Sequence, residues 1–296
     1  MISIIIPTYI KKQLLQNISK NMQFFTGCEV IVVNDNPKES LKDDLKAFKN
    51  FTLIENNQNL GFARSVNRGV RKATKKYVLL LNDDVLLFDE SYKKAIGLFE
   101  KNPLLFAVSF AQKERDNAIV GKNILYWKKG LIFHAKAKDM KFGYNAWADG
   151  GSCLIDKNKF LQLGGFDSIY TPFYWEDIDL SYRAGKHGYK IIFDPSLLVQ
   201  HYHESTIGKN YSQRFIKITA YRNQLIFIWK NITDPLFLLQ HFLFLPYNCI
   251  YYLFKGEKEF ILGFVDALKT INPIFTKRRI DNLKISDRKI LSQFSL

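Results

Sequence analysis

The 296-residue sequence is short of cysteine and of acidic charge. Its three cysteines, Cys28, Cys153 and Cys249, lie far apart without a Cys-x-x-Cys spacing. This pattern argues against a disulfide framework or a zinc site and fits a reducing compartment. Asp and Glu number 28 against 43 Lys and Arg, a net charge of +15. We therefore expect an anionic partner, which is a nucleic acid, an acidic membrane surface or a phosphate-bearing substrate.

The sequence also lacks internal repeats, low-complexity tracts and the order of residues found in a secretory signal. In the opening MISIIIPTYIKK the apolar run precedes the basic residues, which is the reverse of a signal peptide, so we expect a buried strand there. Apolar residues make up 47% and charged residues 24%, as in folded proteins. This composition excludes a mainly disordered, collagen-like or coiled-coil chain. The length favours two units of unequal size.

Four short runs of branched apolar residues predict buried strands in the first part of the chain. They cover residues 3–7, 29–34, 51–55 and 77–81. Helical stretches separate them, and residues 61–75, with apolar side chains at helical spacing, are the clearest of these. Alternating strands and helices predict an α/β unit with a mainly parallel sheet, whose ligands bind beyond the carboxyl ends of the strands.

The chain changes character at about residue 211. Residues 211–296 hold 13 Lys and Arg against 6 Asp and Glu, and residues 235–255 form a long apolar stretch interrupted by Gln240, His241, Pro246 and Asn248. These interruptions argue against a membrane-spanning helix. Interfacial helices on an anionic membrane and an ordinary helical subdomain that packs on the sheet remain equal alternatives.

Polar side chains directly follow two of the predicted strands. Asn82, Asp83 and Asp84 follow residues 77–81, and Asp35 follows residues 29–34. Adjacent carboxylates are suitable oxygen ligands for Mg²⁺ or Mn²⁺, and Asp35 is placed to accept hydrogen bonds from a nucleotide. Ordinary turns are the alternative explanation for both motifs.

Two later motifs combine acidic or basic groups with helix starts. Arg64 lies near the predicted start of the 61–75 helix, where an anion is favoured, although simple capping explains this motif as well. Glu176 and Asp177 begin a helix predicted over residues 176–187, directly after Trp175. Such carboxylates beside an aromatic ring suit a general base that acts on a sugar-like hydroxyl compound. The alternative is that they only complement the helix dipole.

Two histidines, His201 and His203, follow another strand, predicted over residues 189–194. A neutral imidazole is a common metal ligand. Two of the five histidines of the chain in one short stretch indicate a metal site only weakly.

Taken in order, these motifs resemble those of family 2 glycosyltransferases with the GT-A fold. The resemblance covers about residues 1–210 and is carried by IIIPTY, NLGFARSVNRG, NDD and GGFD followed by WEDIDLSYR. It is similar to bacterial cell-surface polysaccharide enzymes of the rhamnosyltransferase-like type, and YRNQLIFIWKN resembles members that act at the inner face of the cytoplasmic membrane. It implies an α/β fold, a Rossmann-like nucleotide-binding mixed sheet flanked by helices, with a catalytic domain at 1–210 and a helical, membrane-proximal C-terminal region at 211–296.

The resemblance also implies a role for individual residues. Asp177 corresponds to the catalytic base, with Glu176 as the second choice. Asp84 and His201 correspond to the ligands of Mg²⁺ or Mn²⁺, with His203 as the alternative histidine. Gly151 and Trp175 are expected at the acceptor, where the ring of Trp175 stacks on a sugar. The nucleotide-sugar site is expected to comprise Pro7, Thr8, Tyr9, Asp35, Asn59, Arg64, Asn82 and Asp83.

Three positions depart from the pattern of the family without removing a group that the chemistry requires. Asn82 replaces the usual first Asp, Ile10 stands where Asn is frequent, and Pro37 stands where Ser is frequent. The first departure leaves the ribose contact and the metal preference open.

We expect an inverting, metal-dependent hexosyltransferase that uses a UDP- or dTDP-linked sugar. The expected acceptor is a hydroxyl of a cell-surface glycan or a lipid-linked glycan. We expect a cytoplasmic protein, peripheral to the inner face of the cell membrane, that acts as a monomer or homodimer and has no nucleic-acid partner. The alternative is a catalytically silent, membrane-associated protein that keeps the GT-A fold to bind nucleotide sugars or glycans.

Overall fold

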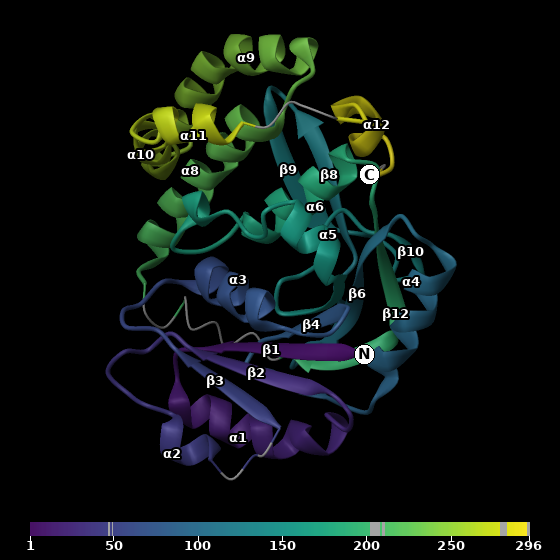
Figure 1. Ribbon diagram of the computed structural model, residues 1–296. Helices are drawn as coiled ribbons and strands as arrows, with labels where there is room; N and C mark the ends of the chain where they lie inside the picture. Colours follow the sequence, from purple (N-terminus) through teal and green to yellow (C-terminus); the bar gives the residue numbers. More distant parts are fainter. Residues whose placement is uncertain (47, 49, 202–207, 209–210, 279–282, 295–296) are drawn as a thin grey trace.

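The computed structural model describes residues 1–296 except 47, 49, 202–207, 209–210, 279–282 and 295–296 (Figure 1). One mixed sheet is built from β1 (Ile2–Thr8), β2 (Glu29–Asn34), β3 (Phe51–Glu55), β4 (Tyr77–Leu81), β5 (Val85–Leu87), β6 (Leu105–Lys113), β7 (Ile119–Val120), β10 (Gly143–Tyr144), β11 (Ser152–Asp156) and β12 (Lys190–His201). A separate hairpin consists of β8 (Asn123–Lys128) and β9 (Leu131–Lys136).

The helices lie on both sides of the large sheet and beyond one end of it (Figure 1). Those of the first two hundred residues are α1 (Lys11–Asn21), α2 (Lys42–Leu45), α3 (Phe62–Lys72), α4 (Ile96–Lys101), α5 (Lys157–Gln162) and α6 (Glu176–Lys186), with short 3₁₀ turns η1 (Met22–Phe24), η2 (Ser91–Ala95) and η3 (Ser168–Tyr170). The C-terminal helices are α8 (Gln213–Asn231), α9 (Pro235–Phe254), α10 (Lys258–Leu268), α11 (Ile271–Lys277) and α12 (Asp287–Leu291).

The sheet confirms the predicted α/β architecture. Its strands follow the order β10-β12-β6-β11-β4-β1-β2-β3. The strands β1 to β4 pair in parallel, whereas β11 is antiparallel to both β4 and β6. The parallel register brings the carboxyl ends of β1, β2 and β4 to one edge, where the chain continues into the predicted polar motifs. Two apolar clusters, one on each face of the sheet, form the core of this part.

The four predicted strands of the first part of the chain are confirmed. One predicted helix and one later predicted strand differ in length from the prediction. The predicted 61–75 helix begins after Gly61, which adopts φ +80°, and ends at Lys72. The strand predicted at 189–194 instead runs from Lys190 to His201. A register shift between Asp194 and Leu198 interrupts its pairing with β6. This irregularity accommodates Pro195, which has no N–H to donate to a ladder, and the strand then continues to the histidine.

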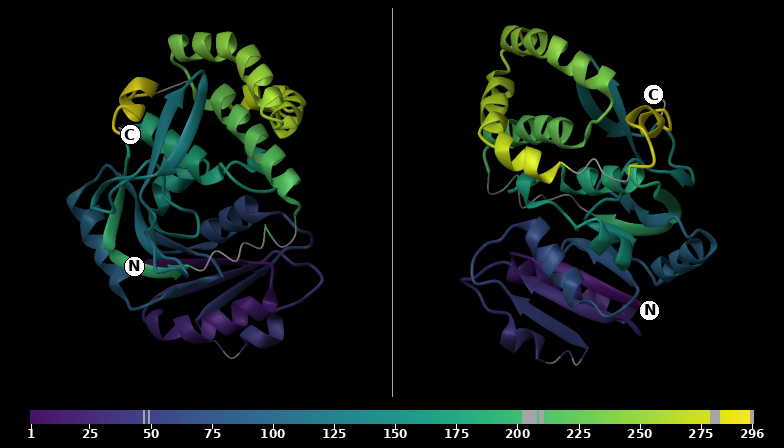
Figure 2. Two further views of the ribbon diagram at one scale, coloured as in Figure 1. Left: turned by 180° about the vertical axis from the view of Figure 1, so that it is seen from behind. Right: turned by 45° about the horizontal axis from the view of Figure 1, so that its top comes forward.

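The C-terminal helices share a hydrophobic core with the middle of the chain. Leu131 of the hairpin, Tyr182 of α6 and Phe227 of α8 belong to one buried cluster. Helix α8 rises from the sheet toward α9, which lies along the far end of the molecule (Figure 2). Residues before and after the change in composition near residue 210 therefore pack in one core. A division into two domains at this position remains a prediction.

Candidate active site

Asp84 and His201 come together because β5 pairs with the last residues of β12. The antiparallel register places His201 opposite Val85, the residue after Asp84. The Asp84 Oδ1 atom lies 3.2 Å from His201 Nε2. Thus two side chains that are separated by more than a hundred residues meet at the edge of the sheet where ligands bind in such folds.

A neighbouring glutamine fixes the orientation of the histidine ring. The Nδ1 atom of His201 lies 2.8 Å from Gln112 Oε1, which accepts its hydrogen when the ring is the Nδ1–H tautomer. Burial lowers the pKa of His201, but the hydrogen bond and the charge of Asp84 outweigh this effect and raise it overall. In the neutral Nδ1–H tautomer, Nε2 carries a lone pair on the side of Asp84. A metal-binding histidine commonly donates its other ring N–H to an acceptor in this way, which fixes the tautomer and the orientation of the ring.

This pair therefore fits a divalent cation, although it does not make a complete site. Among the residues that the structure describes, no group of three or more His, Cys, Asp or Glu is arranged to hold a metal ion. Asp84 Oδ1 is buried and faces the imidazole Nε2 of His201. A carboxylate oxygen and an imidazole nitrogen are suitable ligands, and the diphosphate of a bound nucleotide supplies further oxygens. His203, the alternative ligand, lies outside the described residues.

Asp83 points away from Asp84 and toward the end of β1. Its carboxylate accepts hydrogen bonds from Thr8 Oγ1 at 2.5 Å and Gln13 Nε2 at 2.7 Å. Burial raises the pKa of Asp83 to about 7, with Asp84 contributing in the same direction. Asp83 therefore connects the NDD motif to β1 and α1, whereas Tyr9, the next residue after β1, is exposed.

Asp35 organises the loop before α3. Its carboxylate accepts hydrogen bonds from the backbone N–H groups of Leu60 and Gly61 and from Asn56 Nδ2, all within 2.8 Å. Asn59 also accepts from the Gly61 N–H, at 3.0 Å. The turn considered as the alternative at this motif is present too: the side chains of Asn34 and Asn36 accept hydrogen bonds from the backbone N–H groups of Asn36 and Lys38. The role of Asp35 toward a nucleotide base stays a prediction, as does that of Arg64, which is exposed in the first turn of α3.

The turn at residues 148–151 joins the NDD motif to the predicted base, and sequence reasoning singled out only its last glycine. The Asn82 N–H donates to Gly151 O at 2.8 Å, and the Gly151 N–H donates to Asp149 Oδ1 at 2.8 Å. The Gly150 N–H donates to the carboxylate of Asp177. A Cβ atom on Gly151 would lie 2.7 Å from Asn82 Nδ2, so the side chain of Asn82 would have to shift if any other residue stood here.

Glu176 and Asp177 form the acidic centre of the site together with Asp149. Burial, and then the charge of Asp149, raises the pKa of Asp177 to about 7. Burial and the charge of Asp177 raise the pKa of Glu176 to about 8. Two neighbouring carboxyl groups with raised pKa values hold a proton between them near neutrality, which suits acid–base chemistry.

The backbone before these carboxylates is held in an uncommon conformation by α8. Tyr174 and Trp175 have φ values of +70° and +78°, which are costly for bulky residues. Asn223 of α8 donates from Nδ2 to the carbonyl groups of Tyr170, Phe173 and Tyr174 at 2.9–3.0 Å. This clamp orients the first turn of α6, so that Asn223, which lies in the YRNQLIFIWKN stretch beyond residue 210, positions the predicted base.

Trp175 is buried rather than presented to solvent. Only 4% of it is exposed, and its ring packs against Phe227 and, edge to face, against His134 of β9. His134 also contacts Trp147, and the histidine is the exposed member of this aromatic group. Stacking of Trp175 on an acceptor sugar stays a prediction, and His134 is the ring nearest to solvent.

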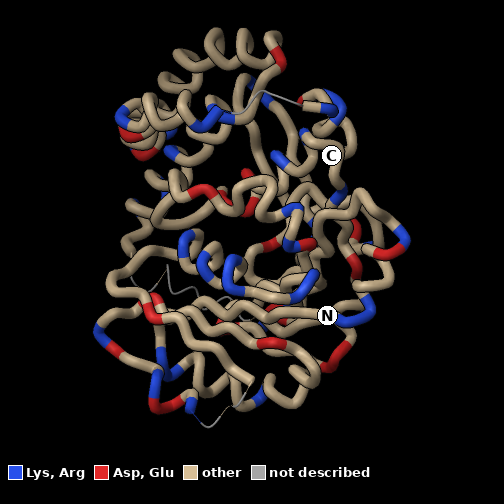
Figure 3. The backbone as a smooth tube through the Cα atoms, in the orientation of Figure 1, with Lys and Arg blue, Asp and Glu red and all other residues tan. Residues whose placement is uncertain are grey.

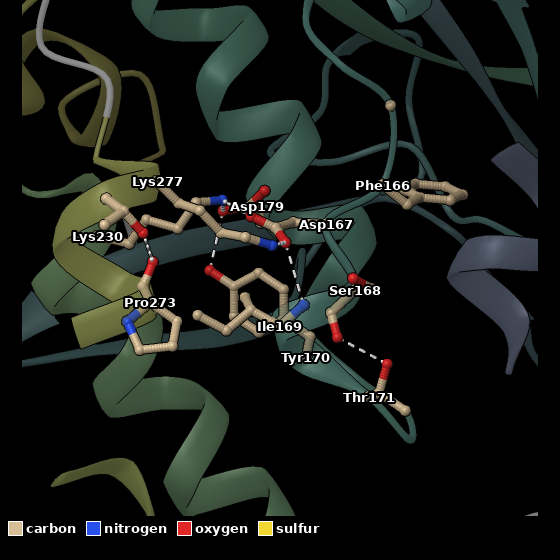
Figure 4. A network of polar contacts seen from close by, with 12 residues as sticks. Phe166, Asp167, Ser168, Ile169, Tyr170, Thr171, Asp179, Lys230, Pro273 and Lys277 are labelled. Carbon is tan, nitrogen blue, oxygen red and sulfur yellow. Dashed lines mark hydrogen bonds and ion pairs between the residues drawn. The ribbon is translucent and has the colours of Figure 1, made fainter. Parts of the chain in front are cut away.

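Asp179 has a different role from the two carboxylates beside it. It is fully buried and accepts hydrogen bonds from Arg183 Nε at 2.8 Å, Lys230 Nζ at 2.6 Å and Asn231 Nδ2 at 2.8 Å. Burial alone would raise the pKa of Asp179, but the cationic partners Arg183 and Lys230 bring it well below its usual range. Lys230 also pairs with Asp167 of the GGFD motif at 2.9 Å, and Lys277 approaches the same carboxylate (Figure 4). This network fixes α6 to α8.

Two positions that sequence reasoning did not select, Asp149 and Gln112, therefore take part in the site. Asp149 could have been found from the Asp-Gly-Gly sequence before a buried strand. Gln112 gives no such signal, because it is one polar residue within an apolar strand and its partner His201 is distant in sequence.

The sequence profile described as Glycosyl transferase family 2 matches residues 3–164, which is more than half of the chain. The chain belongs to this family. The family assignment made from the motifs is thus confirmed, and the rhamnosyltransferase-like subtype stays a prediction. The profile ends before Glu176 and Asp177, so the predicted base lies beyond the matched segment.

Curated relatives of this family 2 chain include poly-beta-1,6-N-acetyl-D-glucosamine synthases. The protein of Staphylococcus epidermidis is 27% identical over 190 residues, which cover 63% of this chain and 45% of the relative. The protein of Staphylococcus aureus strain COL is 25% identical over the same length. The chain thus spans less than half the length of the curated relatives it matches.

Solved structures confirm the GT-A fold at low sequence identity. GalNAc-T7 with UDP, GalNAc and Mn²⁺ superposes with a TM-score of 0.60 and 14% identity over 79% of this chain and 48% of that one. S. aureus TarS 1–349 superposes with a TM-score of 0.55 and 14% identity, covering 92% of this chain and 80% of that one. A mannosyltransferase from Pyrobaculum calidifontis, in complex with GDP-Man and Mn²⁺, gives a TM-score of 0.53 and 15% identity over 95% and 86% of the two chains.

Proposed function

We propose that this chain is an inverting glycosyltransferase that moves a sugar from a UDP- or dTDP-linked donor to a hydroxyl group of a glycan. The observation that carries the proposal is the turn at residues 148–151. One glycine of this turn holds Asn82 at the donor side and the other holds the carboxylate of Asp177. A transferase needs a leaving-group site and a base at a fixed separation, and this turn provides a rigid connection between them.

On the donor side, we propose Asp84 and His201 as the residues that hold a Mg²⁺ or Mn²⁺ ion. When bound, such a cation neutralises the charge that gathers on the leaving diphosphate. The chain itself contributes the orientation of the histidine through Gln112 and the position of the loop held by Asp35. In GalNAc-T7 and the Pyrobaculum mannosyltransferase the solved structures contain Mn²⁺ with a nucleotide or nucleotide sugar, which supports this assignment by analogy.

On the acceptor side, Asp177 is the proposed base. It takes the proton of an acceptor hydroxyl while that oxygen attacks the anomeric carbon, and the bond to the diphosphate breaks. Attack from the face opposite the leaving group inverts the configuration. A pKa of about 7 leaves about half of Asp177 deprotonated and able to accept a proton at neutral pH, while it is a stronger base than an ordinary aspartate.

The proposed acceptor is a cell-surface glycan or its lipid-linked precursor, and the proposed location is the inner face of the cell membrane. Two findings support this choice. The curated relatives are named as synthases of a polysaccharide, and α9 is the one helix among the described residues that is long and apolar enough to cross a bilayer. The chain would act there as a monomer or a homodimer.

The experiment compares donor binding with turnover in the wild type and in Asp177→Asn. Thermal shift with UDP, dTDP, GDP and CDP, with and without Mn²⁺, reports donor binding; release of the nucleotide from donor sugars reports turnover. We expect the variant to keep the nucleotide shift and to lose turnover by about 10²-fold or more. The matched control is Asp116→Asn, a change at an exposed turn carboxylate. Normal turnover by the Asp177 variant would refute the base assignment, and nucleotide binding without turnover by the wild type would favour a silent binding protein.

A further inference from the structure

The outward surface of α9 is apolar along its whole length, although the helix borders solvent. Pro235–Phe254 contains no charged residue, and Figure 3 shows this helix free of acidic and basic positions at one extreme of the molecule. Phe254 is 89% exposed, Leu243 68% and Phe242 61%. The other exposed apolar side chains of the helix are Leu236, Leu239, Phe244, Tyr247, Ile250, Tyr251 and Leu253. We call the exposed side of Pro235–Phe254 the outer face of α9.

Two polar residues of α9, His241 and Asn248, face inward, which is the reverse of an ordinary surface helix. The third, Gln240, is exposed and accepts a hydrogen bond from Trp127 Nε1 at 2.8 Å. His241 is fully buried between Trp229 of α8, whose Nε1 donates to its Nε2 at 2.9 Å, and Gly130 of the β8–β9 hairpin, whose carbonyl lies 2.7 Å from its Nδ1. Asn248 is also buried and donates to Lys129 O at 2.9 Å. The polar interruptions of the apolar stretch are thus used to attach the helix to the protein.

These contacts argue against a spanning orientation of α9 in the folded chain. The hairpin turn is pressed so closely on α9 that a Cβ atom on Gly130 would lie 2.8 Å from Gln240 O. If α9 crossed a bilayer, its bonds to Trp229, Gly130 and Lys129 would break and the freed polar groups would enter hydrocarbon, which is costly. With these bonds intact, α9 lies along the edge of the protein over about 30 Å.

Basic and aromatic side chains border the outer face. Lys129 donates to Tyr247 Oη at 2.9 Å and lies 4.8 Å above the same ring. Lys255, at the end of the helix, lies 5.7 Å above the ring of Tyr251, and Lys128 is exposed at the hairpin turn. Lysines and tyrosines around an apolar strip match the headgroup region of an anionic bilayer. A second copy on a two-fold axis would bring the same lysines together.

We propose that α9 lies in the plane of an anionic membrane, with its outer face in the boundary between headgroups and acyl chains. This inference rests on the proposed function in one respect: the membrane that α9 contacts would hold the lipid-linked acceptor near the site. It selects the interfacial alternative over the spanning helix and the ordinary helical subdomain. Such helices bind by buried apolar area together with attraction to anionic lipid.

The test is co-sedimentation of the full chain with phosphatidylcholine vesicles that contain or lack phosphatidylglycerol. We expect binding to the anionic vesicles that weakens as salt is added. The double variant Leu243→Ser/Phe254→Ser should bind at least tenfold more weakly, because each side chain loses burial in the acyl region. Phe142→Ser/Leu104→Ser, which alters two apolar residues that are 54% and 48% exposed elsewhere, is the matched control and should bind as the wild type does.

A depth measurement separates the in-plane helix from a spanning one. One cysteine at a time is introduced, as Leu236→Cys, Leu243→Cys or Phe254→Cys, in a Cys249→Ser background in which the remaining Cys28 and Cys153 are buried. A fluorophore is attached to the introduced cysteine, and its depth is measured with lipids that carry quenchers at known depths. Similar shallow depths at all three positions are expected; a progression from one surface to the other would overturn the proposal.

Two further outcomes would also overturn it. One is equal vesicle binding by the α9 variant and the wild type, or none by the wild type. The other is a dimer of the wild type in solution that the α9 variant abolishes, since the occupant would then be a second copy. All these measurements omit nucleotide and acceptor, and the nucleotide-dependent thermal shift tests the transferase proposal separately, so that one can fail without the other.

Discussion

Replacing Lys230 by methionine tests whether α8 holds the first turn of α6, which carries Glu176, Asp177 and Asp179, in place. Its ammonium group lies 2.6 Å from Asp179 Oδ1 and 2.9 Å from Asp167 Oδ2, and the lysine is 4% exposed. Methionine keeps much of the length of the side chain but removes the charge. Asp179 would retain Arg183 and Asn231, and its carboxylate would be left with one cation fewer in a fully buried position.

The expected loss of stability is large. Breaking one partner out of a buried ion pair costs about 3–5 kcal/mol, because the remaining charge stays desolvated. The entropy of unfolding is about 2.1 cal/mol/K per residue, which gives about 0.6 kcal/mol/K for a chain of 296 residues. The midpoint temperature of thermal unfolding should therefore fall by about 5–8 °C.

The assay is thermal unfolding of the variant beside Lys269→Met, which removes an exposed ion pair with Asp266 at 2.7 Å. The control should lose at most about 1 kcal/mol. Because the folded pKa of Asp179 is depressed, the stabilisation from its charge is present above the unfolded pKa of about 3.9 and is lost as the pH falls through the folded value. The difference in unfolding midpoint between the wild type and Lys230→Met should therefore be largest near neutrality and become smaller below about pH 4. A midpoint equal to that of the control would refute the anchoring role.

Two other substitutions test the connections within the site. Gly151→Ala places a Cβ atom 2.7 Å from Asn82 Nδ2 and should lower turnover by at least tenfold. The control, Gly97→Ala, has no atom within 4 Å of the added Cβ and should leave turnover unchanged. Equal effects of the two changes in a nucleotide-release assay would contradict the steric argument. Gln112→Leu removes the acceptor of the His201 ring N–H and should raise the Mn²⁺ concentration for half-maximal activity by about 10–100-fold, and a titration with unchanged metal dependence would remove Gln112 from the site.

The order of strands and helices in the first half was predictable because each element has a strong local pattern. The run at β4, for example, is continuously apolar and is followed at once by Asn82, so both the strand and its polar end could be inferred. The antiparallel insertion of β11 between β4 and β6 could not, since antiparallel and parallel strands that are buried on both faces have the same composition. Nor could the extension of β12 through Pro195 to His201, because proline argues against a continuous strand.

For the site, sequence motifs identified the charged groups but not their environments. Glu176, Asp177 and Asp179 form one acidic run, yet the first two have raised pKa values and the third a depressed one. The difference arises from Arg183, one turn later in α6, and from Lys230, which is distant in sequence and lies in α8. Pairings over such distances depend on the packing of α6 against α8, which no local pattern encodes.

The clamp of α8 on the turn before α6 also has a consequence for the protein during its synthesis. A nascent chain that has emerged to about residue 200 already contains every strand from β1 to β11 and the loop held by Asp35. Asn223 and Lys230, which orient and neutralise the turn that carries Asp177, are still to be translated. The loop held by Asp35 is thus translated before His201, which completes the proposed cation pair, and before the residues that fix the proposed base in place, so an unfinished chain is expected to lack a competent base.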